Sequence, residues 1–127
     1  IGTGCGYQAA VLGEIAQQVY SIEIIPQLAT RARRTLIQLG YKNIEVKAGD
    51  GYQGWAEHAP YDAIIVTAAP KRIPQPLIDQ LAINGKMLIS VGTWHQEIFV
   101  LTKTENGMVE ERTIPVRFVP MIRKSRP

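Results

Sequence analysis

Helical and strand-like spacings of apolar residues alternate along most of the chain. Apolar residues recur every three or four positions in 7–17 and 26–39, and Gly40 follows the second stretch as a helix C-cap. Two prolines open a shorter helix expected over 74–81. Short apolar runs predict strands at residues 19–22, 43–48, 62–67 and 86–91. This alternation predicts a mostly parallel sheet with helices on both faces.

The pattern changes after residue 91. Residues 96–102 and 108–114 are strand-like, and the Glu-Asn-Gly segment 105–107 between them is a hairpin signal. We therefore expect an α/β fold, with a doubly wound, mostly parallel sheet and a C-terminal antiparallel hairpin. The unbroken apolar run 63–66 predicts a strand buried on both faces. In such a fold ligands bind at the carboxyl ends of the strands.

Composition narrows the class of protein. The 127 residues suit one domain over 1–127, and 46% hydrophobic residues are enough for a core. No apolar stretch reaches the roughly 18 residues that span a bilayer, so we expect no membrane partner. Cys5 is the single cysteine, and its spacing from His58 and His95 is not that of a zinc site, so we expect a reducing cytoplasm and no metal. Because the chain opens on Ile1 rather than Met, we expect the natural start to lie upstream.

The net charge of +3 is modest, but cations crowd the end of the chain. They are Arg112, Arg117, Arg123, Lys124 and Arg126, against Glu110 and Glu111. Such a tail is typical of a solvated surface, and the alternative is a surface for an anionic partner.

A glycine-rich turn precedes the first helix. Gly2, Gly4 and Gly6 lack a Cβ and let a ligand approach the backbone closely. The third glycine comes one residue earlier than in the dinucleotide fingerprint, and Tyr7 occupies the position of that fingerprint's last glycine. The spacing favours a nucleoside ligand without a pyrophosphate, and the alternative is a tight turn that binds nothing.

Two acids follow predicted strands. Glu23 stands where a carboxylate can accept both hydroxyl hydrogens of a ribose, although a helix-capping surface acid is the alternative. Asp50 lies between two glycines, where it can accept from an adenine amine, although Asp-Gly is also a common turn pair. Together with the glycine turn, these acids predict a nucleoside site at successive strand ends.

Several stretches resemble the protein-L-isoaspartate O-methyltransferase family. They are IGTGCGYQAAVL, VYSIE, GDGYQGW, APYDAIIVTAAP, IPQPLIDQL, GKMLISVG and RFVPM. The resemblance covers nearly the whole chain. A generic methyltransferase would share the glycine turn and an acid at the position of Glu23, but not the YDAIIVTAAP segment followed by paired prolines.

The resemblance implies a Rossmann-like fold that uses S-adenosylmethionine. The cofactor-binding residues that it implies are Gly2, Thr3, Gly4, Gly6, Tyr7 and Gln8 at the methionine part, Glu23 at the ribose, Asp50 and Gly51 at the adenine, and Thr67. The substrate-binding residues that it implies are Ala68, Ala69, Pro70, Val91, Gly92 and Val119, the last within segment 118–121. For Ala69, helix–strand packing is an equally good interpretation.

The reaction implied by the resemblance moves the methyl of S-adenosylmethionine to the α-carboxylate of an L-isoaspartyl residue in a damaged protein. A carboxylate is already ionised at neutral pH, so no general base is required. We accordingly expect no catalytic role for His58, His95 or Cys5. Family members also have an N-terminal region with a substrate-facing hydroxyl and an acid before the glycine turn, so we expect this chain to be truncated at that side and inactive alone.

Two other functions remain open. A methyltransferase of the same fold acting on RNA or a small molecule would make use of the basic tail, but the Thr-Ala-Ala-Pro segment 67–70 has no clamp for a flipped base, so we expect no nucleic-acid partner. A non-catalytic S-adenosylmethionine-binding module is favoured by the absence of the upstream hydroxyl. Isoaspartyl peptides and proteins are the expected partners, and the sequence leaves the oligomeric state open.

Overall fold

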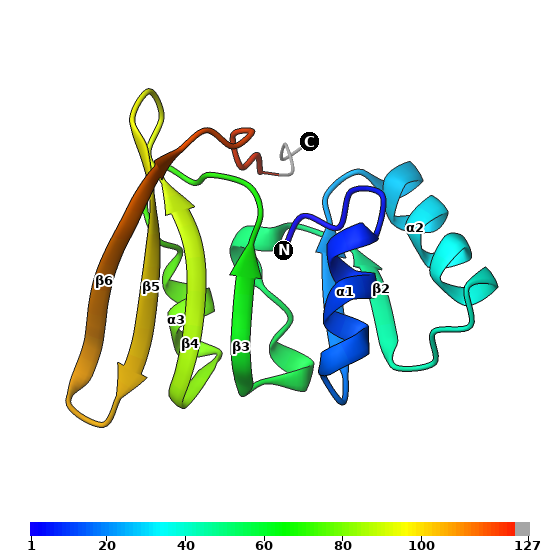
Figure 1. The fold of residues 1–127 in the computed structure, drawn as a ribbon, viewed down its shortest axis with the longest axis horizontal. Coiled ribbons are helices and arrows are strands. Elements are labelled where there is room, and N and C mark those ends of the chain that lie inside the picture. Colours follow the sequence, from blue (N-terminus) through cyan, green and yellow to red (C-terminus); the bar gives the residue numbers. More distant parts are fainter. Residues whose placement is uncertain (124–127) are drawn as a thin grey trace. The chain divides into compact units, whose positions relative to one another are not determined.

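The structure, a computed structural model, describes residues 1–123. The helices and strands are, in chain order, α1 (Tyr7–Ile15), β1 (Val19–Glu23), α2 (Pro26–Gln38), β2 (Ile44–Ala48), β3 (Tyr61–Val66), α3 (Gln75–Asp79), β4 (Leu81–Val91), β5 (Gln96–Thr104) and β6 (Gly107–Val116) (Figure 1). The chain divides into two compact units. We call Gly2–Gly51, with Arg123, the N-terminal unit, and Tyr52–Ile122, with Ile1, the C-terminal unit.

In the N-terminal unit, β1 and β2 form a parallel pair in the register Val19↔Ile44 to Glu23↔Ala48. Helix α2 begins with a proline at its first turn and ends before Gly40, whose φ of 86° requires a residue without a Cβ. The residues of α2 that recur at helical spacing are buried, as the sequence predicts: Ala29, Ala32 and Leu36. Ala29 and Leu36 pack with Ala9, Val19 and Val46 to form the core of this unit.

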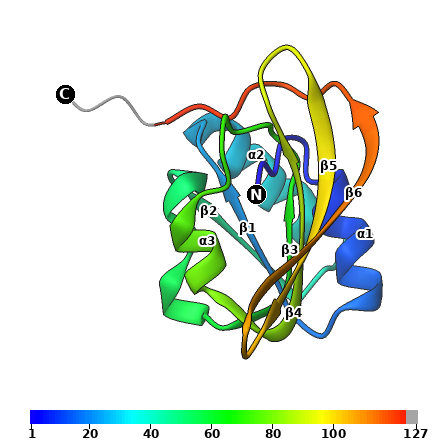
Figure 2. The same ribbon diagram turned by 90° about the vertical axis from the view of Figure 1, so that its left-hand side faces the viewer.

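In the C-terminal unit, the sheet has the order β3-β4-β5-β6, with β6 at its edge (Figures 1 and 2). Strands β3 and β4 are parallel, whereas β4, β5 and β6 pair antiparallel, so the expected C-terminal hairpin is confirmed. Short helix α3 contributes Leu77, which is 1% exposed, to the core of this unit. The other core residues are Ile64, Val66, Leu81, Met87, Ile89 and Leu101.

Two local predictions differ from the structure. Strand β3 is not buried on both faces along its length, because Asp62 and Ala63 are exposed while Ile64 and Val66 are buried. The reason is that β3 pairs with β4 on one side and, among the described residues, only with Ile1 on the other. The strand expected at 86–91 begins earlier, at Leu81, because Asn84 (φ 66°) forms an irregularity within β4 rather than a break before it.

The strands form two sheets within residues 1–123 rather than one. Parallel strands form edges in both sheets: among the described residues, β1 and β2 pair only with each other, and β3 pairs only with β4 apart from Ile1. The ammonium nitrogen of Ile1 donates to Ile65 O at 2.6 Å, and Thr67 N donates to Ile1 O at 3.0 Å. Ile1 therefore hydrogen-bonds beside the carboxyl end of β3 as a parallel strand residue would.

Candidate functional site

The glycine turn 2–6 is fixed by hydrogen bonds to the end of β1. The backbone N–H groups of Gly2 and Thr3 both donate to Ile22 O, at 2.9 and 3.2 Å. Gly2, Gly4 and Gly6 have φ values of 91°, 55° and 89°, which L side chains rarely adopt. This backbone path is therefore available only to glycine, and it ends at Gly6, the N-cap of α1.

Glu23 joins this turn to the following helix. Its side chain is 6% exposed, and its Oε2 accepts from Gly4 N at 2.8 Å while Oε1 accepts from Ile25 N at 3.1 Å. Ile25 is the N-cap of α2, so the helix-capping interpretation of Glu23 describes part of what it does. A carboxylate has about four lone-pair sites, so these two bonds leave each oxygen able to accept once more.

A buried pair of hydroxyls lies beneath the turn, and sequence reasoning missed it. Thr3 Oγ1 and Ser21 Oγ are hydrogen-bonded at 2.6 Å, and both residues are less than 8% exposed. Ser21 stands in an otherwise apolar strand interior, and that single polar position was the available signal. Removal of either hydroxyl would leave the other buried without this partner.

The turn that contains Asp50 is tied to the same strand. Gly49 N donates to Glu23 O at 2.9 Å, which brings the start of this turn to the carboxyl end of β1. Asp50 is half-buried, and Gly51 is buried. The N-terminal unit therefore brings together the glycine turn, Glu23 and the start of the Asp50 turn.

The glycine turn leaves room for a ligand beside Gly4. A Cβ added at Gly4 would meet no atom within 4 Å, so packing within the protein does not fill that position. By contrast, a Cβ at Gly6 would contact Ala32 and Leu36 at 3.5 Å, so Gly6 adjoins the α2 side chains. Tyr7 is 74% exposed, and Gln8 is also exposed on the first turn of α1.

The C-terminal unit gathers most of the residues expected at the substrate. Ala69 pairs with Pro120: Ala69 N donates to Val119 O at 2.8 Å, and Met121 N donates to Ala69 O at 2.9 Å. Gly92 N donates to Pro70 O at 3.1 Å. Ala69 is 4% exposed, which suits its packing interpretation, whereas Val119 is 69% exposed.

Thr67 and its neighbours follow β3 directly. The Thr67 hydroxyl donates to Ile1 O at 2.9 Å, so this side chain helps to hold Ile1 beside the strand. Ala68 and Val91 are both half-buried. Segments 67–70, 91–92 and 118–121 thus meet at the carboxyl ends of β3 and β4, where a ligand crevice was expected.

Sequence reasoning also missed two residues that hold segment 118–121, which we call the strap. Gln96 is 6% exposed; its Nε2 donates to Phe118 O at 3.1 Å, and its Oε1 accepts from Phe118 N at 2.5 Å. Tyr52 donates its hydroxyl to Met121 O at 3.2 Å. The sequence around Gln96 and Tyr52 does not indicate this role, because a Gln at the start of a strand and a Tyr after a turn are usually surface residues.

The remaining candidate side chains are placed as follows. His58 makes an edge-to-face contact with Trp55, with ring centroids 4.9 Å apart, while His95 and Cys5 are exposed.

Residues 1–123 contain no group of three or more His, Cys, Asp or Glu side chains placed to hold a metal ion. In the same residues no helix is long and apolar enough to cross a membrane. Lys124 and Arg126 of the basic tail lie outside the described residues.

Known proteins of one family resemble this chain over nearly its whole length. The profile of the family "Protein-L-isoaspartate(D-aspartate) O-methyltransferase" matches residues 1–126. The protein-L-isoaspartate O-methyltransferase of Gloeobacter violaceus is 62% identical over 126 residues, which are 98% of this chain and 62% of that protein. A relative of the same name from Picosynechococcus is 60% identical over 95% of this chain and 54% of its own length. The chain thus spans little more than half the length of these relatives.

Solved structures of protein-L-isoaspartate O-methyltransferases also resemble this chain. A protein-L-isoaspartate O-methyltransferase structure matches with a TM-score of 0.89 and 30% identity over 94% of this chain and 39% of that chain. A structure from Plasmodium falciparum, described as a protein-L-isoaspartate O-methyltransferase in complex with S-adenosyl-L-homocysteine, matches with a TM-score of 0.78 and 26% identity over 97% of this chain and 64% of that chain. The expected Rossmann-like methyltransferase fold is confirmed, and the chain belongs to the protein-L-isoaspartate(D-aspartate) O-methyltransferase family.

Proposed function

We propose that this chain belongs to an enzyme that transfers the methyl group of S-adenosylmethionine to the α-carboxylate of L-isoaspartyl residues in damaged proteins. The observation that carries the proposal is the family match over residues 1–126, together with a glycine turn whose Gly4 N–H is held by the buried carboxylate of Glu23. Cytoplasmic location and isoaspartyl proteins as partners are part of the same proposal.

The N-terminal unit supports S-adenosylmethionine as the cofactor. The space beside Gly4 admits a ligand close to the backbone, and the N-terminal end of α1 favours a carboxylate such as that of a methionine. The remaining acceptor sites of Glu23 suit two ribose hydroxyls, and Asp50 suits an adenine amine. When bound, the cofactor supplies a methyl group carried by a sulfonium.

The C-terminal unit supports a peptide substrate. Ala68 has a small side chain that leaves room for a peptide backbone, and the strap is fixed by backbone pairing to Ala69 and by Gln96. The substrate carboxylate is already ionised, so these residues need only position it and exclude water from a weak nucleophile. We therefore propose that this chain's residues position the substrate carboxylate and do not act as an acid or a base.

The deciding experiment is a methyl-transfer assay on the full-length protein. A peptide with one L-isoaspartyl residue should accept labelled methyl from S-adenosylmethionine, and the same peptide with a normal aspartyl residue should not. Transfer to RNA or to a small molecule but not to the isoaspartyl peptide would replace the proposal by another methyltransferase activity. Binding of S-adenosylmethionine without any transfer would replace it by a cofactor-binding module.

A further inference from the structure

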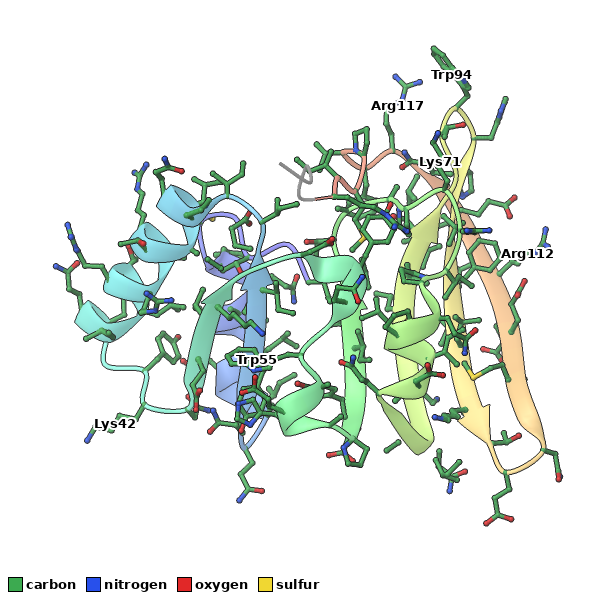
Figure 3. All side chains as sticks on the ribbon, turned by 180° about the vertical axis from the view of Figure 1, so that it is seen from behind. Lys42, Trp55, Lys71, Trp94, Arg112 and Arg117 are labelled. Atoms are coloured by element: carbon green, nitrogen blue, oxygen red, sulfur yellow. The ribbon has the colours of Figure 1, made fainter. Side chains whose placement is uncertain are left out.

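The end of the C-terminal unit that carries the proposed substrate segments is basic. Residues 67–73, 91–96 and 115–122 contain no Asp or Glu, and their charged members are Lys71, Arg72 and Arg117, all exposed. We call these three residues the basic rim. Figure 3 shows Lys71 and Arg117 at the same end of the unit as Trp94.

Hydrogen bonds between the three segments show that the basic rim belongs to one surface. Gly92 N bonds Pro70 O, next to Lys71, and Ala69 N bonds Val119 O. Gln96 holds both backbone groups of Phe118, next to Arg117. The nearest acid along the chain, Glu97, lies 3.7 Å from an Arg112 nitrogen in an exposed ion pair, and Arg112 also pairs with Glu110 at 3.3 Å, so the partner of Glu97 lies outside the rim.

Exposed apolar side chains lie among these cations. Trp94 is 90% exposed, Val119 69% and Ile122 56%. The loop that carries Trp94 is tight: Gly92 has a φ of 127°, and a Cβ there would lie 2.1 Å from His95 O. An exposed tryptophan on a constrained loop is a typical anchor for a binding partner, because its large ring loses little conformational entropy on contact.

We propose that this surface binds the polypeptide on either side of the isoaspartyl residue and selects acidic flanking sequences. The inference rests on the proposed function, since it places the methyl-accepting residue at the adjoining segments 67–70 and 118–121. The occupant is an extended peptide with Asp or Glu near the isoaspartyl residue, because charge complementarity to the three exposed cations of the basic rim favours it. Trp94 contacts the same peptide irrespective of its charge.

Three isoaspartyl peptides, with acidic, neutral and basic flanks, test the proposal with the full-length enzyme. KM should be roughly five- to twenty-fold lower for the acidic than for the basic peptide at low ionic strength, with kcat unchanged, as expected for two or three exposed ion pairs. The difference should shrink as salt is raised, because the pairs are exposed and therefore screened. Equal KM values for the three peptides would overturn the inference while leaving the proposed function intact.

Charge reversal supplies the matched comparison. Lys71→Glu and Arg117→Glu should each reduce or invert the preference for the acidic peptide. Lys86 of β4 is also exposed and lies outside the three segments, so Lys86→Glu should leave the preference unchanged. Trp94→Ala should raise KM for all three peptides by a similar factor. Loss of the preference in Lys86→Glu as well would show that net charge, not this surface, sets it.

A binding measurement keeps the inference independent of catalysis. Fluorescence anisotropy of the same labelled peptides, with S-adenosylhomocysteine present, reads Kd without methyl transfer. Selective binding of the acidic peptide without any methyl transfer would support the inference about this surface and refute the proposed function. Binding of a single-stranded RNA that is tighter than that of the acidic peptide, and lost in Arg117→Glu, would overturn the inference in favour of a nucleic-acid surface.

Discussion

Glu23 is a buried carboxylate whose two oxygens are each bonded to a backbone N–H, of Gly4 and of Ile25. Glu23→Gln keeps the shape but removes one acceptor and the charge. Affinity for S-adenosylmethionine should fall roughly ten- to a hundred-fold, since a charged hydrogen bond contributes about 1.5 to 3 kcal/mol. Titration calorimetry measures this change, with Glu45→Gln, at an exposed position of β2, as the control. Unchanged affinity in a folded Glu23→Gln protein would remove Glu23 from the cofactor site.

Tyr41 and Glu14 form a pH-sensitive link at the surface of the N-terminal unit. The hydroxyl of Tyr41 donates to Glu14 Oε1 at 2.6 Å, and this hydrogen bond, with smaller effects of burial and of the Glu14 charge, raises the pKa of Tyr41 above its ordinary value. A raised folded pKa means that the link is fully present below about pH 10 and is lost as pH rises through the folded pKa.

The pKa of Tyr41 can be measured from its ultraviolet absorbance as the difference between the parent protein and Tyr41→Phe. Glu14→Gln should lower that pKa towards about 10, because it removes the negatively charged acceptor. The same pKa in the parent protein and in Glu14→Gln would contradict the link.

At the scale of the element, α3 depends on a lysine from a neighbouring strand. Lys103 of β5 donates from Nζ to the backbone oxygens of Ile78 and Leu81 at 2.9 Å and of Asp79 at 3.3 Å. Ile78 and Asp79 are the last two residues of a helix of only five, whose final carbonyls lack partners further along the helix, and Leu81 is the first residue of β4. The ammonium therefore serves as a C-cap supplied from outside α3.

Lys103→Met keeps the aliphatic stem and removes all three donated bonds. The free energy of unfolding should fall by about 1.5 to 3 kcal/mol, the range for a hydrogen bond to a charged group. Urea denaturation measures the loss, and Lys86→Met, at an exposed position of β4, should change stability by less than about 0.5 kcal/mol. Equal effects of the two substitutions would show that the contacts of Lys103 contribute nothing beyond those of a surface lysine.

At the scale of the whole molecule, each of the two units has its own apolar core. Among the described residues, β1 and β3 are edge strands, apart from the pairing of Ile1. A chain made of residues 1–127 only should therefore lack a single cooperative melt, since an unpaired strand edge leaves backbone groups without protein partners, at about 1 to 3 kcal/mol for each group that is buried. From the family resemblance it should also show no methyl transfer.

Calorimetry and hydrogen exchange test that expectation. Fast exchange at β1 and β3, and a van't Hoff enthalpy that differs from the calorimetric enthalpy, are the expected signs that the chain does not unfold in one step. One cooperative transition with matching enthalpies, accompanied by isoaspartyl methyl transfer, would contradict both parts of the prediction.

The sequence by itself determined the order and kind of the elements. The helical spacing of Ala29, Ala32 and Leu36, the glycine after α2 and the Glu-Asn-Gly hairpin signal are local patterns that act within one or two turns of chain, so they can be read without a fold. The glycine turn and the position of Glu23 after a strand were equally legible, because a strand end fixes where its next residue lies.

Only the tertiary structure decided which distant residues complete the site. Ser21 beneath Thr3, Gln96 on Phe118 and Tyr52 on Met121 join residues 18 to 69 positions apart, and nothing in the local sequence of either partner indicates the other. The exposure of Asp62 and Ala63 in a strand predicted to be buried was decided in the same way, by which neighbours β3 has. The physical reason is that burial and side-chain pairing depend on contacts between segments, whereas helical spacing and turns depend on the backbone of a single segment.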